Sequence, residues 1–209
     1  VLMMTGILVF GGALLIKLTE GSNISVMGAI FASITARTAG FATYPLGGFS
    51  NAGILVICVL MVIGASPGST GGGIKTTTLF VLIVWIGAFV RQKRLTVIGM
   101  RKVGSEVRSK AATVLVLAIT TLLVAQVLLM GFDGGSYSYE QLLFEAVSAY
   151  ATVGLSMGIT PLLSIGGKLT LILLMFMGRV GAYTLLTSAT RRDDDSDAGI
   201  KYQEFNVMM

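Results

Sequence analysis

Long apolar stretches separated by short clusters of charge run through the whole chain. Between positions 169 and 190 the single charged residue is Arg179. Charge is absent altogether from five further stretches, at 1–16, 38–74, 76–90, 111–132 and 146–167. Because a helix needs about 20 apolar residues to cross a bilayer, the pattern predicts an all-α membrane protein.

Two apolar segments are too short to cross a membrane. One covers residues 25–36 and ends before Arg37, and the other covers 139–150 and contains Glu140 and Glu145. A helix of about twelve residues rises ~18 Å, which is roughly half a membrane. Each segment follows a long apolar stretch and precedes a glycine-bearing loop and a second long apolar stretch. The order of span, half-span, loop and span therefore occurs twice.

An internal comparison supports this duplication. When residues 38–70 are aligned with 152–184, a shift of 114 positions, identical residues fall on the loops and on the same part of the following helix. Upstream, Ile34-Thr35-Ala36 resembles Val147-Ser148-Ala149 with one extra residue in the second copy. The identical pairs are Thr38/Thr152, Gly40/Gly154, Ser50/Ser164, Gly53/Gly167, Leu55/Leu169, Leu60/Leu174, Met61/Met175, Gly64/Gly178 and Thr70/Thr184.

Composition excludes several other classes of protein. Of 209 residues, 54% are apolar and 12% are charged, whereas charged residues make up about 25% of a soluble domain. No histidine is present, so histidine-based catalysis and metal sites are excluded, and Cys58 alone forms neither an intrachain disulfide nor a zinc cluster. The chain starts at Val1 directly in apolar sequence, from which we expect a piece of a longer protein.

Basic residues predict the orientation. They gather in one connection, residues 91–110, which places this connection in the cytoplasm and the two half-span segments at the outer face. We predict a first unit at 1–90, the basic connection, a second unit at 111–190 and a solvated cytoplasmic tail at 191–209. The basic residues are Arg91, Lys93, Arg94, Arg101, Lys102, Arg108 and Lys110.

The two loops have the composition of a cation site. The first is Thr38-Ala39-Gly40 and the second is Thr152-Val153-Gly154. Each follows the C-terminal end of a short helix, where partial negative charge accumulates. Glycine lets successive carbonyls turn toward one axis, and rings of carbonyls replace the hydration shell of potassium. The alternative is that Gly40 and Gly154 only permit tight turns.

A glycine-rich run interrupts the apolar sequence after the first loop. Its spacing approaches that of a phosphate-binding loop, but Ile74 separates the last glycine from Lys75, so nucleotide binding is disfavoured. Proline and repeated glycine instead predict a helix broken within the membrane, acting as a mobile plug below the filter, with a kink without gating as the alternative. The residues concerned are Gly64, Pro67, Gly68, Gly71, Gly72, Gly73 and Lys75, the last facing water.

Isolated charges near the loops suggest further roles. Arg179 lies in an apolar stretch, where a charge usually faces an internal cavity. We expect it below the filter, in contact with the glycine-rich run, or else in a packing salt bridge. Arg37 is expected to brace the first loop through hydrogen bonds. Asp133 and Glu145 lie near helix boundaries, where capping or bracing explains them better than catalysis, so we predict no enzyme.

Four motifs resemble the Trk/Ktr/HKT superfamily of cation transporters, most of all the membrane subunit of a Ktr-type potassium uptake system. They are Thr35–Phe41, Gly64–Thr78, Phe144–Leu155 and Gly178–Gly181. The resemblance implies the third and fourth of four helix–pore helix–helix repeats, half of one pore. It makes 38–40 and 152–154 filter segments, 64–74 the gating loop and Arg179 the pore arginine. Ala182-Tyr183 departs from the family pattern.

The resemblance also implies partners and location. Family members are multi-pass proteins of the bacterial cell membrane that pair as homodimers in lipid. A soluble cytoplasmic ring that binds a nucleotide regulates them, so the nucleotide is expected on that partner and not on this chain. The expected ion is K⁺, with Na⁺ as the alternative, and no covalent cofactor or nucleic acid is expected. A rival hypothesis is a module that anchors the regulatory partner through 91–110.

Overall fold

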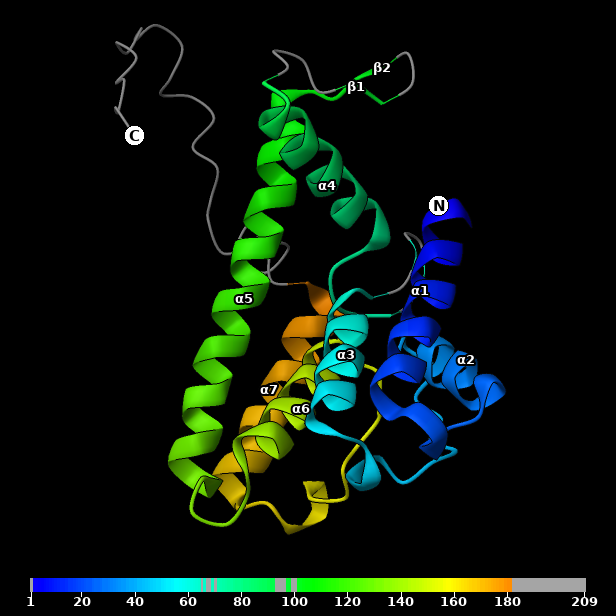
Figure 1. Ribbon diagram of the computed structural model, residues 1–209. Coiled ribbons are helices and arrows are strands. Elements are labelled where there is room, and N and C mark those ends of the chain that lie inside the picture. Colours follow the sequence, from blue (N-terminus) through cyan, green and yellow to red (C-terminus); the bar gives the residue numbers. More distant parts are fainter. Residues whose placement is uncertain are drawn as a thin grey trace, which may run out of the picture.

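The computed structural model describes residues 2–64, 66, 69, 71–92, 97–98 and 101–181. These residues are mostly helical (Figure 1), as the apolar pattern predicts, with one short antiparallel hairpin in the basic connection, of strands β1 (Val97–Ile98) and β2 (Arg101–Lys102). The helices are α1 (Leu2–Glu20), α2 (Val26–Thr35), α3 (Asn51–Val62), α4 (Thr76–Val90), α5 (Ser105–Asp133), α6 (Tyr139–Tyr150) and α7 (Ile165–Val180).

The two half-span segments form the short helices α2 and α6, close to the predicted bounds. Both begin at a serine that supplies an N-cap: Ser25 Oγ accepts the amide of Gly28, and Ser138 forms a capping box with Gln141. Such caps satisfy amides that have no partner within the helix. Short polar residues therefore fix where each half-span helix starts.

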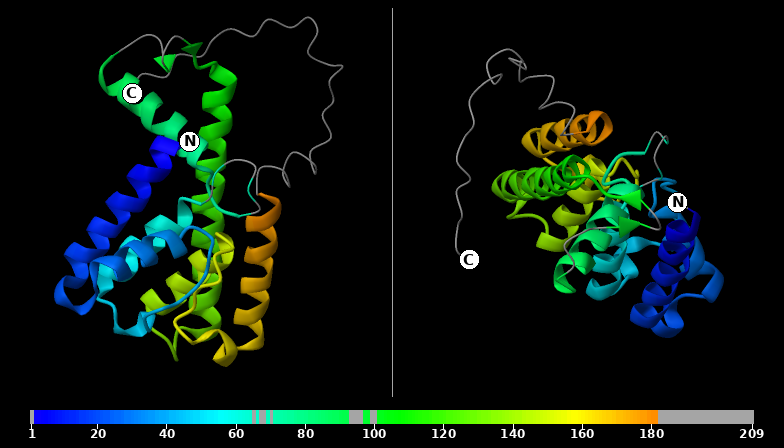
Figure 2. Two further views of the ribbon diagram at one scale, coloured as in Figure 1. Left: turned by 90° about the vertical axis from the view of Figure 1, so that its right-hand side faces the viewer. Right: turned by 90° about the horizontal axis from the view of Figure 1, so that it is seen from above.

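The helices form two groups joined at the centre. In Figures 1 and 2, α1 and α2 lie on one side of the molecule and α5, α6 and α7 on the other. Within the groups α1 packs on α2 and α3, and α7 packs on α5 and α6. Contact between α3 and α6 connects the groups. The half-span helix α6 thus lies at the junction of the two groups, against α3.

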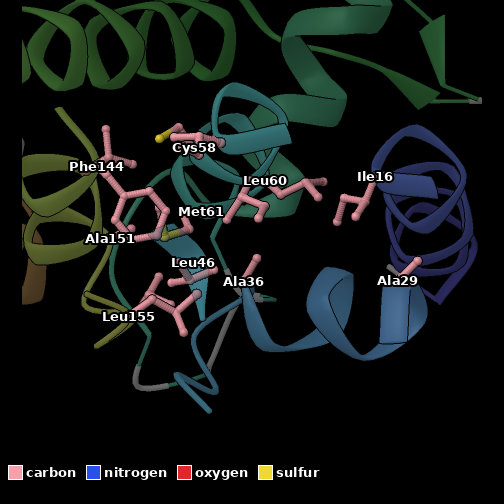
Figure 3. Close-up of a cluster of buried hydrophobic side chains, with 14 of the residues drawn as sticks. Ile16, Ala29, Ala36, Leu46, Cys58, Leu60, Met61, Phe144, Ala151 and Leu155 are labelled. Carbon is pink, nitrogen blue, oxygen red and sulfur yellow. The ribbon is translucent and has the colours of Figure 1, made fainter. Parts of the chain in front are cut away.

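The main apolar core lies at this junction. Figure 3 shows its side chains coming from α1, α2, α3 and α6 and from residues that flank the two loops. Full burial of one large apolar side chain contributes about 1.5–3 kcal/mol, so this cluster holds the groups together. Its labelled members are Ile16, Ala29, Ala36, Leu46, Cys58, Leu60, Met61, Phe144, Ala151 and Leu155, and the thiol of Cys58 is free.

The outer surface is apolar as well. Large side chains such as Phe10, Val127 and Phe176 are more than half exposed, which in water would be an association hazard and in lipid is favourable. In the described part of the chain, the segments Leu2–Asn23 and Ser105–Asp133 are long and apolar enough to cross a bilayer.

Two buried carboxylates cap the helices that follow the loops. Glu20 Oε1 accepts the backbone amide of Ser50 at 2.9 Å and its hydroxyl at 2.7 Å. Asp133 accepts the amide and the hydroxyl of Ser164, both at 2.9 Å. Glu20 is only 5% exposed, and its carboxylate is occupied by the start of α3.

Glycine makes room for each carboxylate. Ser50 Oγ and Ser164 Oγ also accept the amides of Gly53 and Gly167. A Cβ on Gly53 would lie 2.0 Å from Glu20 Oε1, and one on Gly167 would lie 2.1 Å from Asp133 Oδ2. The identical serine and glycine pairs of the internal alignment thus form one capping arrangement, made twice.

Replacing Gly167 by alanine tests this arrangement. The added Cβ should displace the Asp133 carboxylate, cost about 1–3 kcal/mol and lower the midpoint of thermal unfolding in detergent by roughly 3–10 °C. Gly131→Ala is the matched control, because a Cβ at this α5 position meets nothing within 4 Å and alanine favours helix. Equal midpoints for the two variants would contradict the capping role.

Candidate functional site

The two loops share an unusual backbone conformation. Thr38 has φ 72° and Gly40 φ 76°, and at the aligned positions Thr152 has φ 54° and Gly154 φ 91°. Positive φ is uncommon for residues with a side chain and persists where the surroundings enforce it, often at functional sites. Among the described residues three non-glycine positions have positive φ, and two of them are these threonines.

A hydroxyl from each short helix closes the loop that follows it. Thr35 Oγ1 accepts the amide of Phe41 at 2.7 Å and donates to its carbonyl at 2.8 Å. Ser148 Oγ donates to the carbonyl of Leu155 at 2.5 Å. Thr35 and Ser148 are aligned residues, as are Phe41 and Leu155. We call these contacts the hydroxyl clamps, because each ties the residue after the loop to the helix before it.

The loops lie against each other at the centre of the molecule. A Cβ on Gly40 would be 2.2 Å from the carbonyl oxygen of Val153, whereas a Cβ on Gly154 would meet nothing within 4 Å. Ala39 and Val153 are the middle residues of the two loops. Both loops follow helix C-terminal ends, so the partial negative charges of α2 and α6 gather there.

A pocket of about 480 Å³ adjoins the second loop. The loop residues Thr152, Val153 and Gly154 form part of its wall, together with Glu145 from α6 and Arg179 from α7. It thus combines loop backbone, hydroxyl groups and one charge of each sign.

The glycine-rich run breaks the helix where predicted. Helix α3 ends at Val62 and α4 begins at Thr76. Between them the amide of Gly72 donates to Thr152 Oγ1 at 2.7 Å, so the run touches the second loop directly. The Lys75 ammonium donates to the carbonyls of Gly71 and Ser69, and it therefore folds back on the run that precedes it. Pro67 and Gly68 lie outside the described residues.

Glycine residues in the run allow this close approach because they carry no side chain. A Cβ on Gly72 would be 2.9 Å from both the Gly178 carbonyl and the Thr152 hydroxyl. A Cβ on Gly64 would lie 2.2 Å from the Gly72 carbonyl, and Gly73 has φ 72°. Gly72 is thus packed between Thr152 of the second loop and Gly178 near the end of α7.

Arg37 does not brace the first loop as expected. Its Nε is buried, and within the described part of the chain it has no hydrogen-bond partner. The bracing groups are Thr35 and Ser148, together with the capping residues Glu20 and Asp133, none of which the sequence pattern assigned to the loops.

The chain belongs to the TrkH family of cation transport proteins, whose model matches residues 2–197. This match bears out the resemblance of the four motifs, and it places the chain among transport proteins and not among enzymes.

Individual relatives agree with this family. The chain is 37% identical to the Ktr system potassium uptake protein B of Vibrio alginolyticus, covering 99% of the chain and 47% of the relative. It is 33% identical to the potassium/sodium uptake protein NtpJ of Enterococcus hirae, covering 100% and 49%. The chain thus spans about half the length of the curated relatives it matches.

A solved structure shows the same fold. The potassium transporter TrkH from Vibrio parahaemolyticus superposes with a TM-score of 0.67 at 21% identity, covering 90% of this chain and 43% of that one. The predominantly helical architecture is therefore that of a known transporter fold.

Alanine at the two loop glycines should have unequal effects. Both Gly40→Ala and Gly154→Ala force a side chain into positive φ, at about 1–3 kcal/mol each. Gly40→Ala also drives its Cβ into the Val153 carbonyl, which should add at least about 1 kcal/mol. Unfolding midpoints in detergent measure the difference, and an equal loss of stability would show that the loops do not touch.

Proposed function

We propose that this chain forms half of the conduction path of a potassium uptake protein of the cell membrane. The observation that carries the proposal is the repeated loop, with threonine and glycine at positive φ directly after a half-span helix. The names of the Vibrio and Enterococcus relatives, which specify potassium and potassium/sodium uptake, support it.

The loops act as filter segments in this proposal. Residues 38–40 and 152–154 present backbone carbonyls and threonine hydroxyls to a dehydrated cation, and the helix ends behind them favour positive charge. By analogy with the family, glycine in both loops favours K⁺. A Na⁺-conducting member of the family is the alternative, and the potassium/sodium relative is the observation that keeps it open.

The remaining half of the path comes from two further repeats. Residues 1–90 and 111–190 act as the third and fourth repeats of a fourfold pore, and the coverage of about half of each relative supports this division. The protein pairs as a homodimer in the bacterial cell membrane. The basic connection 91–110 and the tail face the cytoplasm, where a soluble ring carrying a regulatory nucleotide docks.

The glycine-rich run serves as the gate. Its amide at Gly72 holds the hydroxyl of the filter residue Thr152, so a movement of residues 64–73 changes what that hydroxyl can bind. Arg179 lies in the wall of the same pocket and adds a positive charge on the ion path. In this proposal the ion path opens when the glycine-rich run and Arg179 both move away from it.

Gly154→Ser tests the filter assignment. The complete protein containing this chain should restore growth of a potassium-uptake-deficient bacterium at low external K⁺. The serine has room but strains the loop, so we expect discrimination of Rb⁺ against Na⁺ to fall by about tenfold, or roughly 1.4 kcal/mol, measured by Rb⁺ uptake with competing Na⁺.

Gly21→Ser is the matched control. Gly21 has φ 56°, also has open space around a Cβ, and lies directly after α1, outside both loops and outside the segment that follows the second loop. It therefore introduces the same backbone strain outside the filter and should leave selectivity close to that of the unmodified protein. Equal selectivity loss in both variants, or in neither, would contradict the assignment of 152–154.

A further inference from the structure

Glu145 lies in the middle of α6 and is 4% exposed. Its carboxylate accepts three hydrogen bonds from the segment that leaves the second loop. Oε1 accepts from Ser156 Oγ at 2.6 Å and from the amide of Met157 at 2.9 Å, and Oε2 accepts from Thr160 Oγ1 at 2.7 Å. The chain just beyond Gly154 is thus tied to the short helix by one buried side chain.

No ion pair to Glu145 occurs among the residues that the structure describes. A buried carboxylate is costly unless hydrogen bonds satisfy it, and here two hydroxyls and one amide do so. The hydroxyls also contact each other, with Ser156 Oγ 2.9 Å from Thr160 Oγ1. Bonds to a charged group are stronger than neutral ones, so this network holds residues 156–160 more firmly than ordinary loop contacts would.

The first loop lacks every side chain of this network. At the aligned positions Ala32 replaces Glu145, Ala42 replaces Ser156 and Leu46 replaces Thr160. Leu46 is buried in the apolar core instead. The carboxylate and both of its hydroxyl donors are therefore present together in one unit and replaced together in the other. The three side chains therefore act together. Because the first unit forms a half-span helix without them, they are not needed merely to support such a helix.

The position of the network links it to the ion path. Glu145, Ser156 and Thr160 line the same pocket as Thr152 and Gly154. The second loop is thus fixed at two points: the Ser148 clamp holds Leu155, and Glu145 holds the residues that follow. The backbone of Gly154 lies directly before both of these points.

We propose that Glu145, acting through Ser156 and Thr160, is a positioning residue that fixes the outer end of the second filter loop and thereby sets ion selectivity. This inference rests on the proposed function. Selectivity depends on holding carbonyls where they suit one cation better than another. Beside the first loop, apolar residues take the place of the Glu145 carboxylate and its donors. The second loop should therefore contribute more than the first to the discrimination between K⁺ and Na⁺.

Two substitutions at Glu145 separate position from charge. Glu145→Ala removes all three bonds and should lower Rb⁺ over Na⁺ discrimination by about tenfold. Glu145→Gln removes the charge, but its oxygen still accepts from Ser156 and Met157 while its amide donates to Thr160 Oγ1. Selectivity should therefore stay within about twofold of the unmodified protein. A loss in Glu145→Gln as large as in Glu145→Ala would overturn the positioning role and assign the effect to charge.

A third variant covers the case in which Glu145→Ala fails to reach the membrane. Thr160→Val removes one donor and leaves the carboxylate with its other two bonds, so it should lower selectivity by about threefold. Glu140→Ala is the control. Glu140 lies on the same helix, but its carboxylate accepts a hydrogen bond from the side chain of Asn51, which lies outside the network. Unchanged selectivity in Thr160→Val and in any well-expressed Glu145→Ala would refute the inference.

The same measurements distinguish this inference from the function beneath it. If the unmodified complete protein shows no Rb⁺ uptake with verified membrane expression, the proposed function fails. If it transports Rb⁺ and discriminates against Na⁺, yet Glu145→Ala does so equally well, the proposed function stands and the role of Glu145 is wrong.

Discussion

The hydroxyl clamps at Thr35 and Ser148 are the contacts on which the loop geometry depends. Each ties the residue that leaves a loop back to the half-span helix that enters it. A threonine at positive φ costs free energy. The hydroxyl clamp joins the two ends of the short loop and compensates for that cost. Without it the chain would relax to ordinary turns.

The surrounding structure holds the clamps in place. Glu20 and Asp133 fix the starts of α3 and α7, which lie directly after the loop segments. The apolar core then presses α3 against α6, so the two loops meet back to back at Gly40 and Val153. Glycine is required at this contact because backbone approaches backbone there. Polar caps thus determine where α3 and α7 begin, and apolar packing determines the distance between α3 and α6.

The two units differ where regulation is proposed. Gly64 and Gly178 are aligned, and each meets a backbone carbonyl, but the partners are not equivalent. Gly178 faces Tyr150 at the end of α6, whereas Gly64 faces Gly72 in the glycine-rich run. At the aligned positions the glycine-rich run therefore contacts α3 and the end of α6 contacts α7. The bond of the run to Thr152 places the asymmetry directly at the second loop.

Local patterns in the sequence predicted much of this arrangement. The charge-free stretches and the short segments 25–36 and 139–150 anticipate the helices within a few residues, and the glycine-rich run anticipates the break after α3. A capping role for Asp133 was predicted from its place near a helix boundary and is confirmed, whereas the cap at Glu20 and the hydroxyl clamps were not predicted, because they join residues that are far apart in sequence or depend on exact backbone geometry. Yet the pairs Ser50/Ser164 and Gly53/Gly167 were already visible as identities. These pairs are explained by the carboxylates that lie 30 and 31 residues before the serines, Glu20 in one unit and Asp133 in the other. The two carboxylates differ in residue type and lie outside the aligned stretches, so they produced no identity.

The central claim is that the two loops bind the permeating ion. The most direct measurement is the anomalous scattering of Rb⁺ in crystals of the complete protein grown in rubidium salt. The account predicts Rb⁺ density on the axis beside the backbone carbonyls of residues 38–40 and 152–154. Well-ordered loops without Rb⁺ density, or density confined to a site that neither loop touches, would contradict it.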